Sequence, residues 1–471
     1  MDIPYYVSNK EVVLVKPLQN DDQSVKFAEK VQICLTKQQK GATIELHSNA
    51  KEELAMLLEF SCSDHKSIKD QILFSTVASK DTTNEDSLYT YGSTRVLRTA
   101  VIYGANGSGK SNFVDAIQFV RNLVTNSINH QPGQGILQNP HKLSGADAES
   151  KYAIQFVTNG IRYAFGFTLK HLLVIDEYLY YFPSGRQVKI YERNEETFFA
   201  GNKFKNRFET CRDVLKPNRL LLSCAANFSN VDEVAQAFSF FRDELVIYRG
   251  LGTDNWMEYS LEQINANPAM KKVVLTFLQS LGTGIKDIKV KIDKANMQAS
   301  DLPPFLADEF KAMLLSNPIN KIDAKVVYSN FETDLMTEES VGVRKLFEML
   351  CPFVDIIIKG KVLICDELEA SLHESILHGL VNLFRQLKSE KFAQLIFTTH
   401  DTSILDLDLF RRDQVWFTEI SQDSRATELY SLAEIKNVRK GENVGKGYIM
   451  GKYGAIPMLN VNLAQIISEA T

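Results

Sequence analysis

Residues Arg98 to Val120 read RTAVIYGANGSGKSNFVDAIQFV, and this stretch decides the fold. It begins with a short apolar run, continues with a glycine-rich loop that fits the pattern GxxxxGK[ST], and ends with apolar residues at helical spacing. The pattern predicts a strand, a tight loop and a helix in direct succession. A glycine loop that matched by chance would not also predict the strand before it and the helix after it.

The loop has the composition that phosphate binding requires. Its glycines let backbone N–H groups wrap around phosphate oxygens, while Lys110 reaches the terminal phosphates and the hydroxyl of Ser111 ligates Mg²⁺. The candidate nucleotide-contacting residues are the loop and the residue after it: Gly104, Ala105, Asn106, Gly107, Ser108, Gly109, Lys110, Ser111 and Asn112.

Two carboxylates follow a second apolar run, in the sequence VLICDE at 362–367. At the end of a buried strand, Asp366 can hold Mg²⁺ and Glu367 can polarise an attacking water. Adjacent acids at a solvated strand end are common by themselves. The phosphate-binding loop in the same chain therefore favours the catalytic interpretation.

A histidine ends a third strand-like run, which covers residues 394–399. His400 lies 33 positions after Glu367, and the sequence between them predicts one helix and one strand. A histidine at the carboxyl edge of such a strand can sense the γ-phosphate through a hydrogen bond. A lone histidine is more often structural, but this position favours the functional interpretation.

A polar stretch, ESVGVRK at 339–345, precedes an apolar helix. Ser340 and the backbone N–H groups near Gly342 would face an anion from the N-terminus of that helix. Taken alone, the stretch is equally a plain helix cap. Its place ahead of Asp366 and Glu367 resembles that of the signature element, which ABC-type ATPases offer to the nucleotide of the opposite subunit.

The totals describe a globular protein with a sizeable core. At 471 residues the chain exceeds what one core usually supports, so we expect two units or one domain with a large insertion. No 18-residue apolar run and no secretion signal stand out, so a cytoplasmic protein without membrane contact is expected. The six cysteines form no CxxC pair and indicate reduced packing residues, and the net charge of −5 gives no argument for nucleic-acid binding.

Composition and periodicity divide the chain into five segments. We expect an N-terminal extension at 1–55, the first half of an α/β head with the glycine loop at 56–150, and a β-hairpin region of that head at 151–204. A helical insertion at 205–330 follows, and the second half of the head, with the two acids and His400, occupies 331–471. The expected fold class is thus α/β, with a mixed β and helical insertion between the glycine loop and Ser340.

Local patterns within these segments support the division. Thr158-Asn159-Gly160 and Pro183-Ser184-Gly185 each interrupt an alternating pattern, which predicts two hairpins. In the next segment, four apolar residues fall on one helix face: Val234, Phe238, Phe241 and Leu245. No sustained heptads are present, so the insertion is expected to be globular rather than a long coiled coil.

The order of these motifs resembles that of the ATPases of bacterial anti-phage and abortive-infection systems. The shared features are DELEASLH at 366–373, THDTS at 399–403 and RRDQVWF at 411–417. Such ATPases include RloA-like proteins, the ATPase subunits of PARIS and Septu, and the ATPase half of the OLD nucleases. The resemblance covers about Met56 to Pro457 and implies an ABC/SMC-type P-loop ATPase head.

The resemblance implies ATP and Mg²⁺ as cofactors and assigns roles at matching positions. The implied roles are phosphate and Mg²⁺ contact for Lys110 and Ser111, Mg²⁺ binding for Asp366, general base for Glu367, action in trans for Ser340 and Gly342, and phosphate sensing for His400. Lys66, in DHKSIK at 64–69, is similar to the basic residue that these proteins place near the nucleotide.

The sequence departs from the family pattern in two places. Val341 and Val343 replace the usual neighbours in the signature element. No glutamine stands out for the Q-loop of these ATPases, and Gln131, Gln134 and Gln138 remain candidates.

Three other patterns are given a structural interpretation. His373 and His378 are one position too far apart for a HExxH metal site, and we expect them on a helix surface. Asp406-Leu407-Asp408 resembles a nuclease acid pair, but the 71 residues after His400 are too few for a fused TOPRIM nuclease, so a loop is expected. The basic glycine-rich stretch Gly445 to Gly454 is expected to form an interface or a packed turn.

The leading hypothesis is a regulatory or sensor ATPase. It would assemble with a second copy around ATP, as a dimer or higher homo-oligomer, and control a separately encoded effector, a nuclease or toxin. The alternative is a DNA-binding repair ATPase of the RecF/Rad50 type, which makes DNA a second candidate partner. A basic run at Lys286, Lys289, Lys291 and Lys294 is either a recognition surface or a solvated face. A transporter subunit is disfavoured because about 230 residues separate Lys110 from Ser340.

Overall fold

The computed structural model describes residues 7–8, 11–12, 54–250, 255–295, 315, 319–370, 372–386, 391–436, 438–439 and 441–456. Most of the extension expected at 1–55 lies outside these residues, as do Cys34, Ser371, Leu387 and residues 457–471. Two short strands, β1 (Val7–Ser8) and β2 (Glu11–Val12), are described within the extension and pair with each other.

A six-stranded core sheet carries the predicted motifs, in the order β13-β17-β18-β7-β19-β20. All neighbours are parallel except the last pair. The strands are β7 (Thr99–Gly104), β13 (Leu245–Tyr248), β17 (Val362–Cys365), β18 (Gln394–Thr398), β19 (Val415–Ile420) and β20 (Thr427–Ser431). Strand β18 therefore lies between β7, which leads into the glycine loop, and β17, which leads into the two acids.

The core strands are apolar because helices cover both faces of the sheet. Every residue of β7, β17 and β18 is buried, as expected for central strands of a parallel sheet. The predicted strand–loop–helix succession is confirmed, since α2 (Lys110–Asn126) begins directly after the glycine loop. The buried face of α2 includes Phe113, Ile117 and Val120.

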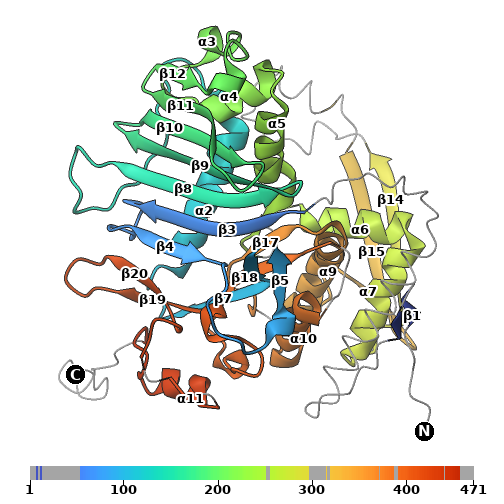
Figure 1. The fold of residues 1–471 in the computed structure, drawn as a ribbon. Coiled ribbons are helices and arrows are strands. Elements are labelled where there is room, and N and C mark those ends of the chain that lie inside the picture. The colour runs from blue at the N-terminus through green and yellow to red at the C-terminus, as the bar shows by residue number, and fades with distance from the viewer. Residues whose placement is uncertain are drawn as a thin grey trace, which may run out of the picture.

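A seven-stranded antiparallel sheet lies beside the core and occupies the upper left of Figure 1, in the order β12-β11-β10-β9-β8-β3-β4. Its strands are β3 (Met56–Ser63), β4 (Ile72–Ser75), β8 (Ser150–Thr158), β9 (Ile161–Lys170), β10 (Leu173–Phe182), β11 (Val188–Asn194) and β12 (Thr197–Ala200). Both predicted hairpins are confirmed, because β8 pairs with β9 and β10 pairs with β11. The sheet joins residues of the segments expected at 56–150 and 151–204, so these two form one structural unit.

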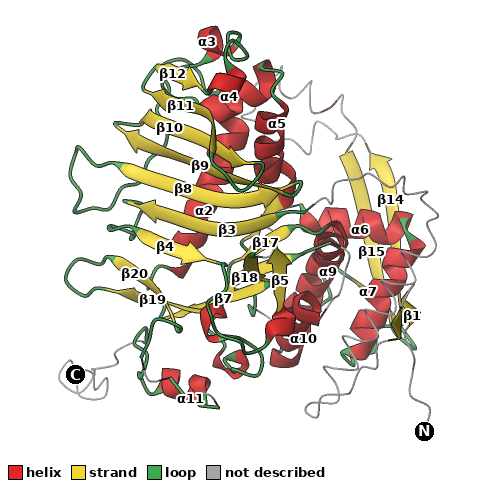
Figure 2. Ribbon diagram, in the orientation of Figure 1, coloured by secondary structure: helices red, strands yellow, loops and turns green. Residues whose placement is uncertain are grey.

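In Figure 2, one group of helices lies beside the antiparallel sheet and another lies on the opposite side of the core sheet. The remaining α-helices are α3 (Cys211–Val214), α4 (Leu221–Phe228), α5 (Asp232–Ser239), α6 (Trp256–Ala266), α7 (Pro268–Ser280), α9 (Val341–Lys359), α10 (Glu374–Gln386) and α11 (Val444–Ile449). Short 3-10 or π turns are η1 (Glu85–Ser87), η2 (Ser127–Asn129), η3 (Asn202–Phe204), η4 (Phe240–Glu244), η6 (Thr402–Ile404) and η7 (Arg412–Gln414). No helix in these described ranges is long and apolar enough to cross a membrane.

The expectation of a helical insertion over 205–330 needs a correction. The segment contains α3 to α7, but its strand β13 is part of the core sheet and pairs in parallel with β17. The four residues assigned to one helix face divide accordingly: Val234 and Phe238 lie on α5, Phe241 lies in η4, and Leu245 begins β13. All four residues are buried in one hydrophobic cluster. The sequence thus predicted correctly that they are buried, but not that they belong to three different elements. In an apolar run of only four residues, the spacing of the apolar residues does not distinguish a buried strand from a helix.

Three of the four lysines of the basic run, Lys289, Lys291 and Lys294, lie on a strand, and Lys286 directly precedes it. A small antiparallel sheet combines β14 (Asp287–Ala295), β15 (Ile319–Val327) and β16 (Glu332–Asp334), with β5 (Leu88–Tyr91) and β6 (Thr94–Leu97) forming a separate hairpin. On β14, Lys289 forms an ion pair with Glu332 and Lys291 forms one with Asp293. These pairs offset part of the positive charge, which favours the solvated-face interpretation.

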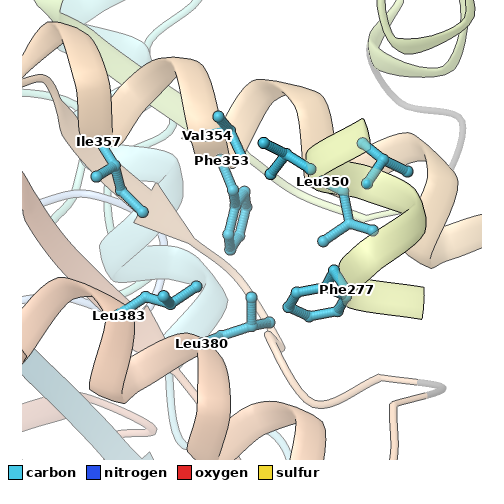
Figure 3. Close-up of a pocket in the computed structure, with 9 residues that line it drawn as sticks. Phe277, Leu350, Phe353, Val354, Ile357, Leu380 and Leu383 are labelled. Atoms are coloured by element: carbon cyan, nitrogen blue, oxygen red, sulfur yellow. The ribbon is translucent and has the colours of Figure 1, made fainter. Parts of the chain in front are cut away.

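Helices α7, α9 and α10 form a closely packed apolar layer (Figure 3). Phe277 from α7, Phe353 from α9 and Leu380 from α10 all line the gap between these helices. The remaining void is ≈ 10 Å³, about the space of one water-sized sphere. The gap is thus part of the core and not a ligand site.

Candidate nucleotide-binding site

The glycine loop begins at the carboxyl end of β7 and wraps tightly against neighbouring strands. Gly107 and Gly109 adopt φ values of 77° and 107°, a region that side chains with a Cβ rarely adopt. A Cβ on Gly104 would lie 2.2 Å from Thr418 Oγ1, and a Cβ on Gly109 would lie 2.2 Å from Thr427 Oγ1. The loop therefore needs glycine for both backbone conformation and space.

Two threonines from β19 and β20, which lie about 300 residues after the loop in the sequence, hold this loop in place. The hydroxyls of Ser108 and Thr418 lie 2.7 Å apart, and Thr427 Oγ1 donates to the carbonyl oxygen of Ser108 at 2.9 Å. The Thr427 hydroxyl also lies 2.7 Å from that of Ser67, which accepts a hydrogen bond from Asn112 Nδ2 at 2.6 Å. Sequence analysis missed both threonines because β19 and β20 reach the loop only in the folded chain.

Lys110 lies with its ammonium group folded back onto the loop. Its Nζ donates to the carbonyl oxygen of Gly104 at 2.7 Å and to that of Ala105 at 3.2 Å. Burial lowers the pKa of this ammonium to about 8, although the carboxylates of Glu367, Glu369 and Asp366 oppose the shift. Negatively charged phosphates in the loop would stabilise the charged form.

The two predicted acids follow β17 and are positioned by a threonine on β18. Thr398 Oγ1 donates to Asp366 Oδ1 at 2.6 Å and accepts a hydrogen bond from the backbone N–H of Glu367 at 2.8 Å. Asp366 is buried, whereas Glu367 is exposed and has a φ of 49°, which is rare for a residue with a side chain. Of the two neighbouring carboxylates, that of Asp366 is thus held inside against β18 and that of Glu367 is open to solvent.

His400 lies at the end of β18, between the glycine loop and the acids. Its Nδ1 lies 3.4 Å from Lys110 Nζ, and its backbone N–H donates to Glu369 Oε1 at 2.6 Å. Burial and the charge of Lys110 lower the pKa of His400, against the opposing effect of the neighbouring carboxylates. A neutral imidazole at this position can accept a hydrogen bond from Lys110 and donate one from its other nitrogen.

The residues present fit a magnesium ion and a triphosphate. Ser111 and Asp366 supply hydroxyl and carboxylate oxygens, which are the ligands that Mg²⁺ prefers. The buried oxygen Glu369 Oε2 has no hydrogen-bond partner in the chain. The carboxyl edge of the sheet therefore offers a ligand a free hydrogen-bond acceptor. Among the described residues, no group of three or more His, Cys, Asp or Glu side chains could hold a metal by itself.

Lys66 lies in a charged cluster beside the start of α2. Its Nζ lies 2.6 Å from Asp115 Oδ2, to which His65 Nε2 is also hydrogen-bonded at 3.0 Å, and Arg249 Nη1 lies 2.8 Å from Asp115 Oδ1. Burial alone would raise the pKa of Asp115, but the hydrogen bonds from His65 and Lys66, with the charge of Lys66 and the bond from Arg249, hold it well below its ordinary value. Asp115 and Arg249 were not predicted from the sequence.

The predicted signature residues begin α9. Ser340 is the N-cap of this helix, and its Oγ accepts a hydrogen bond from the backbone N–H of Val343 at 3.3 Å. Ser340 is exposed and Gly342 is half-buried. The structure therefore shows the helix cap, and the hydrogen bonds described for Lys110, Asp366 and His400 do not involve Ser340 or Gly342.

A buried lysine connects the signature helix with the acids. Lys345 Nζ donates to the carbonyl oxygen of Ala370 at 2.5 Å and to that of Leu368 at 3.4 Å. Both carbonyl groups belong to the loop that follows Glu367. Lys345 thus connects α9 with the loop that follows the two acids.

The three candidate Q-loop glutamines lie in a different environment. Gln138 Nε2 donates to Ser150 Oγ at 2.8 Å, next to the antiparallel sheet. Gln134 Oε1 accepts a hydrogen bond from the backbone N–H of Gln131 at 3.1 Å. Each of these contacts stabilises the connection between α2 and β8 and none involves Lys110 or Asp366.

The motif at 411–417 has a structural explanation. The buried guanidinium of Arg411 pairs with Asp413 at 2.9 Å and also donates to the carbonyl oxygen of Asp81. Gln414 Nε2 donates to Thr99 Oγ1 at 2.7 Å, at the start of β7. These contacts connect the strand of the glycine loop with β19.

The three patterns interpreted as structural also have local explanations. His373 Nδ1 accepts a hydrogen bond from Ser375 N–H at the start of α10, and Asp406 Oδ1 accepts one from Asp408 N–H in a turn. The basic glycine-rich stretch contains α11, and Lys452 forms an ion pair with Glu442. Five cysteines are free and buried: Cys62, Cys211, Cys224, Cys351 and Cys365.

Comparison with known families gives one match in two segments. Residues 100–217 and 321–406, less than half of the chain, match the family described as "AAA domain, putative AbiEii toxin, Type IV TA system". The matched segments contain the glycine loop, Ser340, the two acids and His400. No curated protein matches the chain at a significant level.

Solved structures with a similar arrangement include heads of SMC proteins. The SMC head domain from Thermotoga maritima is 13% identical, with 80% of this chain and 98% of that chain covered and a TM-score of 0.37. The Smc head with an extended coiled coil from Pyrococcus furiosus, bound to the C-terminal domain of ScpA, is 12% identical, with 80% and 96% covered and a TM-score of 0.36.

The fold assignment rests on the motifs and the sheet described above. The strand of the glycine loop, the strand of His400 and the strand of the two acids are neighbours in one parallel sheet, and an antiparallel sheet adjoins it. A capped helix precedes the strand of the acids. With the match to an AAA-type ATPase domain, these features show that the chain has the fold of an ABC/SMC-type P-loop ATPase head.

Proposed function

We propose that this chain binds and hydrolyses ATP and acts as a regulatory or sensor subunit of a bacterial anti-phage defence system. One observation carries the ATPase proposal: Lys110, Asp366 and His400 belong to three sequence-distant segments and converge at one edge of the core sheet. Lys110 Nζ lies 3.4 Å from His400 Nδ1, and Thr398 on the strand of His400 donates to Asp366 at 2.6 Å.

Each converging group has a task in phosphoryl transfer to water. Lys110 neutralises the terminal phosphates, and Ser111 and Asp366 would hold a magnesium ion, which would supply Lewis-acid charge. Glu367 accepts the proton of the attacking water from its exposed position after β17. The neutral imidazole of His400 donates a hydrogen bond to the γ-phosphoryl group as it is transferred to water. Its other nitrogen accepts one from Lys110 and so holds the ammonium in place.

The signature residues would complete the site of a second copy. Ser340 is exposed at the start of a 19-residue helix, whose N-terminal N–H groups and dipole favour an anion. Its neighbour Val341 is 46% exposed although it is apolar, which suits a surface that is covered in an assembly. ATP held between two copies would bring Ser340 of one to the glycine loop of the other.

Complementation between two inactive variants tests this arrangement. Ser340→Arg and Lys110→Ala should each abolish turnover as pure proteins. A mixed dimer contains one composite site without either substitution, so a co-assembled mixture should regain ATP hydrolysis. Continued inactivity of a mixture shown by mass to contain mixed dimers would contradict sharing in trans, while leaving nucleotide binding by a single copy intact.

The regulatory role is supported by the matched family, whose description refers to a toxin of a type IV toxin–antitoxin system. We propose that ATP-driven assembly holds or releases a separately encoded nuclease or toxin. Co-purification with the product of the neighbouring gene, with and without ATP, tests this role. Tight binding of bare DNA with a steep dependence on salt would instead favour the repair ATPase of RecF/Rad50 type.

Substitutions on β14 test whether the basic run at Lys286 to Lys294 is a recognition surface. Deleting residues 205–330 would remove β13 from the core sheet and α6 and α7 from the hydrophobic core, so substitutions are used instead. Lys289→Glu with Lys291→Glu reverses charge on exposed positions of β14 and leaves the core unchanged. Loss of effector binding would assign recognition to β14, and unchanged binding would place recognition elsewhere.

A further inference from the structure

The carboxylate of Glu369 has one oxygen that the chain itself does not use. Glu369 Oε1 accepts a hydrogen bond from the backbone N–H of His400 at 2.6 Å. The other oxygen, Oε2, is buried and has no hydrogen-bond partner among the described residues. Burying a carboxylate oxygen without a donor costs free energy, so this oxygen indicates a ligand that donates a hydrogen bond to it.

The turn that carries Glu369 is firmly held. The backbone N–H of Ala370 donates to the carbonyl oxygen of Glu367 at 3.0 Å, and the side chain of Leu368 between the two acids is fully buried. Lys345 Nζ donates to the carbonyl oxygens of the residues on both sides of Glu369. Glu367 and Glu369 therefore both leave one fixed turn at the carboxyl end of β17.

Three cationic or titratable groups surround this carboxylate. Burial lowers the pKa of Lys110, of Lys345 and of His400, and the negative charge of Glu369 opposes each of these shifts. None of the three groups donates a hydrogen bond to Oε2. Lys110 and Lys345 donate to backbone carbonyl oxygens instead. The carboxylate is thus within electrostatic reach of the whole site, while its second oxygen is available to a ligand.

The surroundings limit which donor Oε2 can accept. Phosphate oxygens are acceptors and carry negative charge, so the phosphates of ATP cannot donate to it. A metal ion would need further ligands, and within the described ranges no three His, Cys, Asp or Glu side chains are placed to hold one. A water molecule is small and neutral and donates two hydrogen bonds. The residues assigned to the attacking water adjoin Glu369, because Glu367 shares its turn and His400 is hydrogen-bonded to it.

We propose that Glu369 is a second water-binding carboxylate of this site, whose Oε2 accepts a hydrogen bond from the water that attacks the γ-phosphate. The water oxygen forms a bond to phosphorus while the bond from phosphorus to the ADP oxygen breaks. One proton of the water passes to Glu367, and the hydrogen held by Glu369 stays on the phosphate product. With both hydrogens fixed by acceptors, a lone pair of the water points at the phosphorus. This inference rests on the proposed function.

Glutamine at this position separates the roles of the two oxygens. In Glu369→Gln the amide oxygen must face the N–H of His400, so the NH₂ group replaces Oε2 and cannot accept a hydrogen bond from water. Single-turnover hydrolysis should slow about tenfold or more, while affinity for a non-hydrolysable ATP analogue stays within about twofold of the wild type. Glu369→Ala should be at least as slow. Wild-type turnover in Glu369→Gln beside a slow Glu369→Ala would show that only Oε1 matters and would overturn the proposal.

Glu434→Gln is the matched control. One carboxylate oxygen of Glu434 also accepts a backbone N–H, that of Ser431 at 3.2 Å, but Glu434 is exposed and follows β20. This variant should keep wild-type turnover and affinities. Slowing equal to that of Glu369→Gln would contradict a specific role for Glu369.

Affinity for a transition-state mimic provides a readout that does not depend on turnover. ADP with aluminium fluoride imitates the phosphoryl group in transfer with its attacking water in line, whereas ADP alone does not. Glu369→Gln should weaken binding of the aluminium fluoride complex about tenfold and leave ADP affinity unchanged. An equal loss of both would assign Glu369 a merely structural role. A large increase in the Mg²⁺ concentration needed to bind the ATP analogue would make Glu369 a metal ligand, and either result overturns the proposal.

Combination with Glu367→Gln tests whether the two carboxylates act on one water. The double variant should be slowed by less than the product of the two single effects, because the second substitution acts on a water that is already misplaced. Effects that multiply would assign the carboxylates to independent steps and contradict a shared water. Normal hydrolysis by Glu369→Gln refutes this inference alone, whereas a wild type that neither binds nor hydrolyses ATP refutes the proposed function.

Discussion

The ammonium nitrogen of Lys110 lies 3.4 Å from Nδ1 of His400, although 290 positions separate the two residues in the chain. The contact joins the helix after the glycine loop to the end of the neighbouring strand. Because both groups titrate and face the same carboxylates, the protonation of one depends on the other. Because Lys110 and His400 have different proposed tasks, we expect substitution of each residue to cause a different defect.

His400→Ala should slow ATP hydrolysis about a hundredfold or more, the magnitude usual for loss of a positioned proton-transfer or oxyanion-stabilising group. ATP affinity should change little, because the glycine loop and Lys110 remain. Lys110→Ala should show the opposite pattern, with affinity lost and the fold retained. Titration calorimetry and single-turnover kinetics separate the two, and wild-type ATP affinity in Lys110→Ala would refute the assigned role of the loop.

ATP affinity should fall as the pH rises above about 8, because burial lowers the pKa of Lys110 to about 8 in the free protein. Below pH 8 the ammonium is already charged in the free protein. Bound phosphates raise its pKa, so at a pH above 8 Lys110 takes up a proton when ATP binds. Calorimetry in buffers of different ionisation enthalpy should detect this uptake at pH 9. The same uptake in Lys110→Ala would assign the proton to another group.

Glu367→Gln should bind ATP normally but hydrolyse it at least about a hundredfold more slowly, since an amide cannot accept the proton of the attacking water. ATP-bound assemblies should then accumulate and be visible by light scattering. Glu374→Gln is the matched control, because Glu374 is an exposed acid in the first turn of α10. Similar slowing in both variants would argue against a specific role for Glu367.

Thr398→Val should raise the Mg²⁺ concentration needed for half-maximal activity and destabilise the fold by about 1–3 kcal/mol, because Asp366 Oδ1 and the N–H of Glu367 lose their shared partner. Thr399→Val is the control, since the hydroxyl of Thr399 accepts a hydrogen bond from the backbone N–H of Asp401 instead. Titration of Mg²⁺ and urea unfolding measure the two effects. Unchanged Mg²⁺ requirements in Thr398→Val would show that Asp366 needs no support from β18.

Local patterns predicted much of the site. The glycine loop, its strand and its helix follow from the composition and spacing of residues 98–120, and the hairpin at Thr158 to Gly160 follows from an Asn-Gly turn. The acids and His400 were recognisable because each ends an apolar run of strand length. In all these cases, neighbours in the sequence are also neighbours in the structure.

The sequence by itself determined the strand, the loop and the helix around Lys110, because glycine conformations and helical spacing are local properties. Only the tertiary structure decided that β13 joins the core sheet, that Thr398 supports Asp366, and that Arg249 faces Asp115. These contacts depend on parallel pairing between strands far apart in the chain, such as Leu245 with Val362. Short buried strands have similar apolar sequences whichever strand they pair with. The packing of the whole core therefore determines the pairing.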